Sequence, residues 1–274
     1  MRTVLSGGSD HPVVLLTTGI VYMQTSFWCG AASQPLHLSV MRPRSHFSYD
    51  DTVTDYPCLV FLAGGSFREV DCNVWMPELL YYVRHGFVVA SVEYGTTFKT
   101  RFPAQMEQIS CAIRYIRANA KALHVKSDEI AIMGESAGGY FSVLSGLAGA
   151  SERYGNGLYG QYPSGVRCAV GLYPVTNVRT LGFDPEKQEI PYDAFSYPVL
   201  AESVDPKVSK PILLVHGTGD SQVASSQSEE LYVALQKAGV PSDLVLVEGA
   251  EHADHPFFRD SVKQTILEFI AAHI

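Results

Sequence analysis

A serine with glycines close on both sides lies between two regular segments of the chain. The sequence GESAGG occupies residues 134–139, with Ser136 near its centre. Residues 129–133 before it, apolar except for Glu129, predict a strand, and residues 139–147 predict a helix. A serine on such a turn presents its hydroxyl at the carboxyl edge of a sheet, beside the free N–H groups of a helix start. Ser136 is therefore our candidate nucleophile; the alternative is a serine that only caps a glycine-rich helix.

A serine hydroxyl attacks poorly without a base, and the base needs an acid that holds its tautomer. In the doubly wound hydrolase architecture, the acid and then the histidine follow the serine along the chain. The predicted strand at residues 212–216 is followed by Asp220, our candidate acid, whose alternative is an ordinary turn aspartate beside glycine. The predicted strand at residues 243–247 leads to His252 and His255. We favour His252, which comes first, as the base.

Acyl transfer also needs N–H donors for the oxyanion of the tetrahedral intermediate, and losing one typically lowers the rate about 10²–10³-fold. Ala137 follows the candidate nucleophile and offers one backbone N–H. A diglycine comes directly after the apolar strand predicted at residues 58–63, and glycines let a loop turn its amides inward. We expect Gly65 and Ser66 to supply the other donors; the alternative is an ordinary diglycine turn.

Strand-like and helix-like segments alternate along the chain, which predicts an α/β fold with a doubly wound, mostly parallel sheet and helices on both faces. A turn is expected at residues 126–128, and His216 at a strand end is typical of a hydrogen-bonded core residue. The remaining strands are predicted at residues 13–16, 36–41, 87–92 and 168–172, and the remaining helices at 76–85, 103–120, 225–238 and 260–273.

The sequence has no composition break, so residues 1–274 are interpreted as one domain. Residues 182–210 are the least regular stretch and contain four prolines. A loop of that length is usually functional, as a lid or substrate-lining loop, or simply mobile. We favour the lid.

Composition narrows the classes of function. The chain has 46% hydrophobic residues and a formal net charge of −8, which disfavours nucleic acid or an anionic membrane as a partner. The start of the chain lacks a signal-peptide pattern, and no run approaches the roughly 18 apolar residues of a membrane span. The five cysteines are scattered and have no metal-ligand spacing. We expect reduced thiols, a cytoplasmic location and no bound metal.

Taken in order, these motifs resemble the α/β-hydrolase superfamily. Within it the chain is most similar to small microbial acetyl and feruloyl esterases of the bifunctional deacetylase/feruloyl-esterase type and their hormone-sensitive-lipase-like relatives. The resemblance covers residues 36–269 and is carried by VFLAGGSF, VASVEYG, RFPAQMEQISCAIRYIRANAKAL, IAIMGESAGGYFSVL, PILLVHGTGDSQV and VLVEGAEHAD. It implies the α/β-hydrolase fold, with Ser136 as nucleophile, Asp220 as acid, His252 as base, and Gly65, Ser66 and Ala137 as oxyanion donors.

The chain departs from this family pattern at two places. The family usually has His-Gly-Gly-Gly at the oxyanion loop, whereas residues 63–66 read AGGS. The backbone donors survive the change, but the missing histidine leaves open what braces the loop. The family's final His-Gly is His252-Ala253 here.

We therefore expect a cofactor-independent serine hydrolase acting on short-chain or aromatic acyl esters, with acetyl or feruloyl groups on a small molecule or an oligosaccharide favoured. Phe67 and Tyr140 are among the aromatic residues expected to line an aromatic-friendly cleft; the alternative is that they pack the core. An amide hydrolase of the peptidase or formamidase type is the second hypothesis. A catalytically idle binding module is the third. The sequence predicts no oligomeric state.

Overall fold

The structure is a computed structural model that describes residues 12–27, 30–44, 55–96, 100, 102–148, 154–155, 157–178 and 205–274. The stretch predicted as a lid, residues 182–210, lies outside the described residues up to residue 204.

The described residues form one eight-stranded sheet in the order β1-β2-β4-β3-β5-β6-β7-β8. The first two strands form an antiparallel hairpin that pairs antiparallel with β4, and every later neighbour pair is parallel. This is the mostly parallel sheet expected from the sequence. Its strands are β1 (Val13–Phe27), β2 (Ala32–Arg44), β3 (Tyr56–Leu62), β4 (Val88–Val92), β5 (Val125–Glu135), β6 (Ala169–Leu172), β7 (Ile212–Gly217) and β8 (Ser242–Val247).

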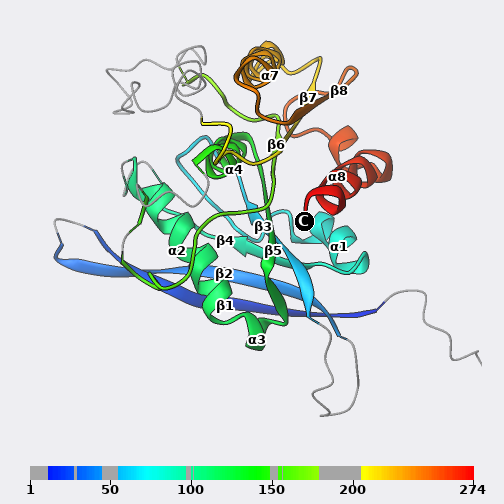
Figure 1. Cartoon of the computed structure of the whole chain (residues 1–274). Helices are drawn as coiled ribbons and strands as arrows, with labels where there is room; N and C mark the ends of the chain where they lie inside the picture. The colour runs from blue at the N-terminus through cyan, green and yellow to red at the C-terminus, as the bar shows by residue number, and fades with distance from the viewer. Residues whose placement is uncertain are drawn as a thin grey trace, which may run out of the picture.

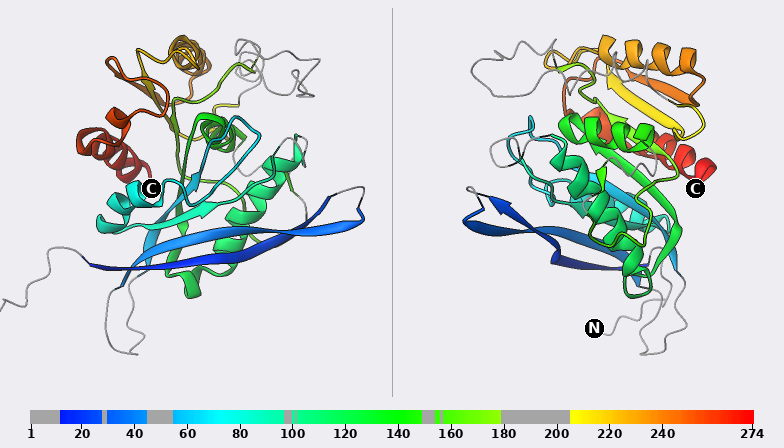
Figure 2. Two further views of the ribbon diagram at one scale, coloured as in Figure 1. Left: turned by 180° about the vertical axis from the view of Figure 1, so that it is seen from behind. Right: turned by 60° about the vertical axis from the view of Figure 1, so that its left-hand side comes forward.

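Helices cover both faces of the sheet, as Figure 1 and Figure 2 show. Apolar side chains of α2, α4 and α7 pack into one core cluster, and those of α1 and α8 pack into the cluster on the opposite face. The strands between them are buried on both sides, which is why they read as continuous apolar runs. The helices are α1 (Met76–Arg84), α2 (Ala104–Ala118), α3 (Ala120–Leu123), α4 (Ser136–Ala148), α7 (Ser226–Ala238) and α8 (Asp260–His273), with a 3₁₀ turn η4 (His255–Phe258) before α8.

The largest errors of the sequence predictions lie in the first hairpin. Strands β1 and β2 are far longer than the predicted segments 13–16 and 36–41. They pair with each other from Val13 opposite Arg44 to Phe27 opposite Ala32. Much of β1 is exposed at the sheet edge, so its sequence carries little apolar periodicity, and the pairing itself determines its length.

The turn predicted at residues 126–128 is also wrong. These residues belong to β5, which already begins at Val125 after α3. Their side chains are polar and exposed, and Lys126 forms an ion pair with Glu129. A strand that begins with polar, exposed residues resembles a turn in sequence, because the residues that pair with it lie far away along the chain.

The remaining findings concern cysteines and membrane spans. Four cysteines, Cys58, Cys72, Cys111 and Cys168, are free and buried, and Cys29 lies outside the described residues. No helix in the described ranges is long and apolar enough to cross a bilayer.

We predict that Ile109→Ala destabilises the fold by about 2–5 kcal/mol, because it leaves a cavity where α2 packs on the sheet. Ile109 is fully buried. Urea unfolding measures the difference. Val233→Ala on the outer face of α7, where the side chain is 64% exposed, is the control and should change stability by less than about 0.5 kcal/mol. Equal effects at both positions would contradict the packing described here.

Candidate active site

Ser136 lies on a sharp turn where β5 ends and α4 begins. Its φ of 52° is in the left-handed region, which is strained for a serine and persists only where surrounding packing enforces it. Gly138, two residues on, lies so close to β3 that a Cβ there would come within 2.1 Å of the Leu62 carbonyl oxygen. Glycine at 138 therefore lets α4 start directly against the sheet, and this fixes Ser136 at the carboxyl edge.

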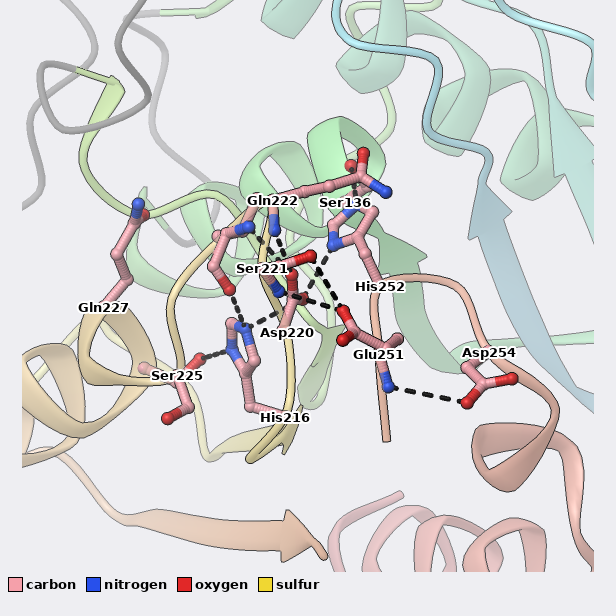
Figure 3. Close-up of polar contacts among 12 residues, drawn as sticks. Ser136, His216, Asp220, Ser221, Gln222, Ser225, Gln227, Glu251, His252 and Asp254 are labelled. Atoms are coloured by element: carbon pink, nitrogen blue, oxygen red, sulfur yellow. Dashed lines mark hydrogen bonds and ion pairs between the residues drawn. The ribbon is translucent and has the colours of Figure 1, made fainter. Parts of the chain in front are cut away.

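His252 lies between Ser136 and Asp220. Its Nε2 is 2.9 Å from Ser136 Oγ, and its Nδ1 is 2.7 Å from Asp220 Oδ2 (Figure 3). If Nδ1 carries the proton and donates it to the carboxylate, Nε2 is free to accept the serine hydroxyl. The ring is further held by Tyr173, whose ring meets the imidazole edge-on at a centroid distance of 4.8 Å.

Of the two candidate histidines, His252 and His255, the structure brings only His252 to Ser136. His255 is exposed at the start of η4, where its backbone N–H donates to Asp254. The neighbouring Ala253 has a φ of 57°, a conformation that favours glycine. The family's glycine after the histidine therefore corresponds to a position that is strained in this chain.

Asp220 is a buried carboxylate whose oxygens are well supplied with donors. Its Oδ1 accepts the backbone N–H groups of Gln222 and Val223, at 3.0 and 2.8 Å. Its Oδ2 lies near His252 and, at 3.3 Å, near His216 Nε2 (Figure 3). Burial raises the pKa of Asp220, but the hydrogen bonds from His216, His252 and Val223 outweigh it and hold the pKa well below its usual range.

His216 is the hydrogen-bonded core residue that its sequence position suggested, and it also contacts the candidate acid. It is fully buried on β7, with Nδ1 2.7 Å from Ser228 Oγ and Nε2 2.8 Å from the Val223 carbonyl oxygen. Because a carbonyl only accepts, Nε2 must carry a proton. That N–H is directed at the Val223 carbonyl and passes close to the Asp220 carboxylate. His216 therefore helps to hold the loop that presents Asp220.

The predicted oxyanion donors lie on the two loops beside the nucleophile. Ala137 is in the first turn of α4, where backbone N–H groups have no partner within the helix. Gly65 and Ser66 are exposed, at φ values of 131° and 53°. Within the described ranges no hydrogen bond engages the N–H of either residue. That they bind an oxyanion stays a prediction.

Phe67 and Tyr140 are in the core rather than on a cleft. They are 3% and 0% exposed, and their rings pack edge-to-face at a centroid distance of 5.8 Å. Both belong to the cluster on the α2 and α4 face of the sheet. The prediction that these two residues line a substrate cleft is therefore corrected. Phe67 on the loop after β3 and Tyr140 on α4 fill the same apolar space in the core.

Sequence reasoning missed two residues next to this site, Glu135 and Trp75. The Glu135 carboxylate is buried directly before Ser136 and accepts hydrogen bonds from Trp75 Nε1 and from the Gly64 backbone N–H. The signal that could have found Glu135 is an acidic residue at the end of an otherwise apolar strand. Nothing local to Trp75 indicates its role.

A comparison with protein families assigns the chain. The family model of BD-FAE matches residues 47–235, well over half of the sequence. The chain belongs to the BD-FAE family. The match includes Ser136 and Asp220 and ends before His252. It confirms the resemblance to acetyl and feruloyl esterases that the sequence motifs indicated.

Individual relatives of this BD-FAE chain are distant. It is 24% identical over 218 residues to the isoprenylcysteine alpha-carbonyl methylesterase of Arabidopsis thaliana, an alignment covering 72% of this chain and 50% of that protein. The chain spans about half the length of the curated relatives it matches.

Solved structures confirm the α/β-hydrolase fold. A truncated carbohydrate esterase from gut microbiota superposes with a TM-score of 0.80 at 21% identity, over 98% of this chain and 99% of that one. An acetyl ester-xyloside bifunctional hydrolase from Caldicellulosiruptor lactoaceticus gives a TM-score of 0.71 at 21% identity, over 97% and 96%.

We predict that the stabilising effect of Asp220 depends on pH. Because its pKa is lowered in the folded state, its contribution is complete above the ordinary pKa of about 3.9 and is lost as the pH falls below that value. The measurement is the difference in unfolding free energy between the wild type and Asp220→Asn. It should be constant down to about pH 4 and then shrink by at most about 1.4 kcal/mol per pH unit. Asp243→Asn at an exposed aspartate is the control, and a difference that grows on acidification would be the wrong sign.

We further predict that Ala253→Gly leaves the fold as stable or more stable, by up to about 1 kcal/mol. Relief of left-handed strain, about 1–2 kcal/mol, exceeds the entropy that glycine adds to the unfolded chain. Thermal unfolding of the variant measures this. The same substitution at Ala234, in the middle of α7, should instead destabilise by about 1 kcal/mol. A loss at position 253 as large as that at 234 would refute the prediction.

Proposed function

We propose that this chain is a serine carboxylesterase that hydrolyses acetyl or feruloyl esters carried by carbohydrates. The observation that carries the proposal is the continuous hydrogen-bond chain from Ser136 Oγ to His252 Nε2 at 2.9 Å and from His252 Nδ1 to Asp220 Oδ2 at 2.7 Å. A base and a carboxylate in this order are what a serine needs to attack an ester carbonyl. Membership in the BD-FAE family supports the ester as the bond that is cleaved.

The proposed reaction begins when Ser136 Oγ attacks the acyl carbon. His252 Nε2 accepts the hydroxyl proton, and the resulting imidazolium is stabilised by the Asp220 carboxylate. The low pKa of Asp220 keeps that carboxylate ionised throughout the ordinary pH range. The carbonyl oxygen becomes an oxyanion and accepts hydrogen bonds from the backbone N–H groups of Gly65, Ser66 and Ala137.

The tetrahedral intermediate then collapses, with His252 returning its proton to the departing alcohol oxygen. The acyl group stays on Ser136 as an ester. A water molecule takes the place of the alcohol, gives its proton to His252 and attacks the same carbon. The second intermediate releases the carboxylic acid and restores the serine hydroxyl. The proposed reaction uses only the ester, water and the side chains named above, and it includes no cofactor.

The substrate class rests on the relatives. The gut-microbiota neighbour is described as a carbohydrate esterase, and the neighbour from Caldicellulosiruptor lactoaceticus as an acetyl ester-xyloside hydrolase. We extend that class to this chain, with a small ester or an oligosaccharide ester as the partner. Since both core clusters lie on one continuous sheet, we also propose that residues 1–274 act as a single hydrolase domain.

We predict that purified protein hydrolyses p-nitrophenyl acetate, acetylated xylo-oligosaccharide or methyl ferulate, and that Ser136→Ala lowers kcat at least about 10⁴-fold because it removes the nucleophile. The panel also contains p-nitrophenyl butyrate and octanoate, N-formylkynurenine and a peptide anilide. Ser261→Ala, at an exposed serine of α8, is the matched control and should retain full activity.

The alternatives give different results in the same assay. Amide turnover without a preference for esters favours the amide hydrolase. Silence across the panel, together with no Ser136-dependent labelling by a fluorophosphonate, favours an idle binding module. Ester turnover that survives in Ser136→Ala excludes the proposed nucleophile.

A further inference from the structure

The oxyanion loop, residues 63–67, lacks the histidine that the family usually has at its start, so the loop must be held by other groups. Glu135 lies beside it. The Glu135 residue is only 6% exposed, and its Oε1 accepts both the Gly64 backbone N–H and, at 3.0 Å, the indole N–H of Trp75. One buried carboxylate oxygen therefore links the segment before the nucleophile, the oxyanion loop and the residue that precedes α1.

We propose that Glu135 is a positioning residue that braces the oxyanion loop through Gly64, so that the N–H groups of Gly65 and Ser66 stay directed at the reacting carbonyl. This inference rests on the proposed function. In this chain, a carboxylate on β5 would take the place of the histidine that the family usually has at the start of the loop.

The space at position 64 fits this role. A Cβ on Gly64 would lie 2.7 Å from both carboxylate oxygens of Glu135, so any side chain there would push the carboxylate away. A residue without a side chain at position 64 thus lets the Glu135 carboxylate lie against the backbone of the loop. The sequence alone suggests only that the glycines let the loop turn.

The loop also needs an external hold because its backbone is strained. Ser66 and Phe67 have consecutive φ values of 53° and 62°, and such non-glycine conformations persist only when neighbouring groups enforce them. Tyr94 anchors the loop from the other side, since its hydroxyl donates to the Ala63 carbonyl oxygen at 2.6 Å. The Gly65 carbonyl accepts the N–H groups of Arg68 and Glu69. Between these anchors, the N–H groups of Gly65 and Ser66 have no acceptor among the residues that the structure describes.

The Glu135 carboxyl has titratable neighbours that could give it a different role. Burial raises its pKa, and the two hydrogen bonds and the charge of His252 oppose that shift. The buried Tyr173 hydroxyl lies close enough to interact with it, without a well-formed hydrogen bond. A purely electrostatic effect on His252 would require the charge, whereas bracing requires only an acceptor oxygen at Oε1.

Two substitutions separate these roles. Glu135→Gln keeps a carbonyl oxygen that can accept both N–H groups but removes the charge, and Glu135→Leu removes the acceptor. We expect kcat for p-nitrophenyl acetate to fall about 10²–10³-fold in the leucine variant, as when an oxyanion donor is lost, and less than about tenfold in the glutamine variant. KM should change little, because the donors act mainly on the transition state.

The position of Trp75 provides a readout that needs no activity. The chain has two tryptophans, so its NMR spectrum has two indole N–H signals, and Trp75→Phe identifies the one from Trp75. That proton should exchange slowly with solvent in the wild type and in Glu135→Gln, and faster in Glu135→Leu. Asp205→Leu is the control, because Asp205 also accepts a backbone N–H, that of Lys207, yet precedes β7 at the sheet edge opposite Ser136. It should leave kcat unchanged.

The proposal is overturned if Glu135→Leu retains kcat within about threefold while Trp75 loses its protection. It is also overturned if the glutamine and leucine variants lose kcat equally and both shift the acidic limb of the pH profile, since the charge would then be what matters. If the wild type cleaves no ester, the proposed function fails on its own. The role of Glu135 is then tested by the exchange rate of the Trp75 indole proton alone. An unchanged exchange rate in Glu135→Leu would refute that role.

Discussion

The imidazole of His252 must reach Ser136 with one nitrogen and Asp220 with the other, and the rest of the site is arranged around that requirement. A ring with its two nitrogens in fixed positions tolerates little displacement of either neighbour, because hydrogen bonds weaken steeply with distance and angle. The serine is held by the strained turn between β5 and α4, and the aspartate by the loop after β7. The parallel sheet provides this precision, since it brings the carboxyl ends of β5, β7 and β8 to one edge.

Two carboxylates are buried near this edge, and each is surrounded by donors. An unpaired buried charge is strongly unfavourable, so each needs several hydrogen bonds to remain in the folded protein. Asp220 receives backbone N–H groups and two histidines, which lower its pKa. Glu135 receives one backbone N–H and one indole N–H, and its pKa remains raised. The hydrogen bonds of Asp220 therefore outweigh the effect of burial on its pKa, whereas those of Glu135 do not.

Family membership and geometry inform different parts of the functional proposal. The BD-FAE match and the esterase neighbours indicate the bond and the class of substrate, while the hydrogen-bond chain at Ser136 indicates how that bond would be cleaved. Phe67 and Tyr140 pack against each other in the core beside the oxyanion loop and α4.

The sequence by itself determined the parts of this protein that depend on local pattern. Apolar runs of strand length, helical periodicity and GESAGG between them were enough to predict the sheet, the helices on both faces and Ser136, because each signal lies within a few residues. The sequence favoured His252 over His255 by its position, but only the tertiary structure brings the His252 ring to Ser136, because the two residues are 116 positions apart and the loop after β8 determines where the ring lies. The tertiary structure also decided the length of the first hairpin, through pairing between strands. The contacts of Glu135 with Gly64 and Trp75 belong to the same class: they join residues 71 and 60 positions apart, and no local pattern records such contacts.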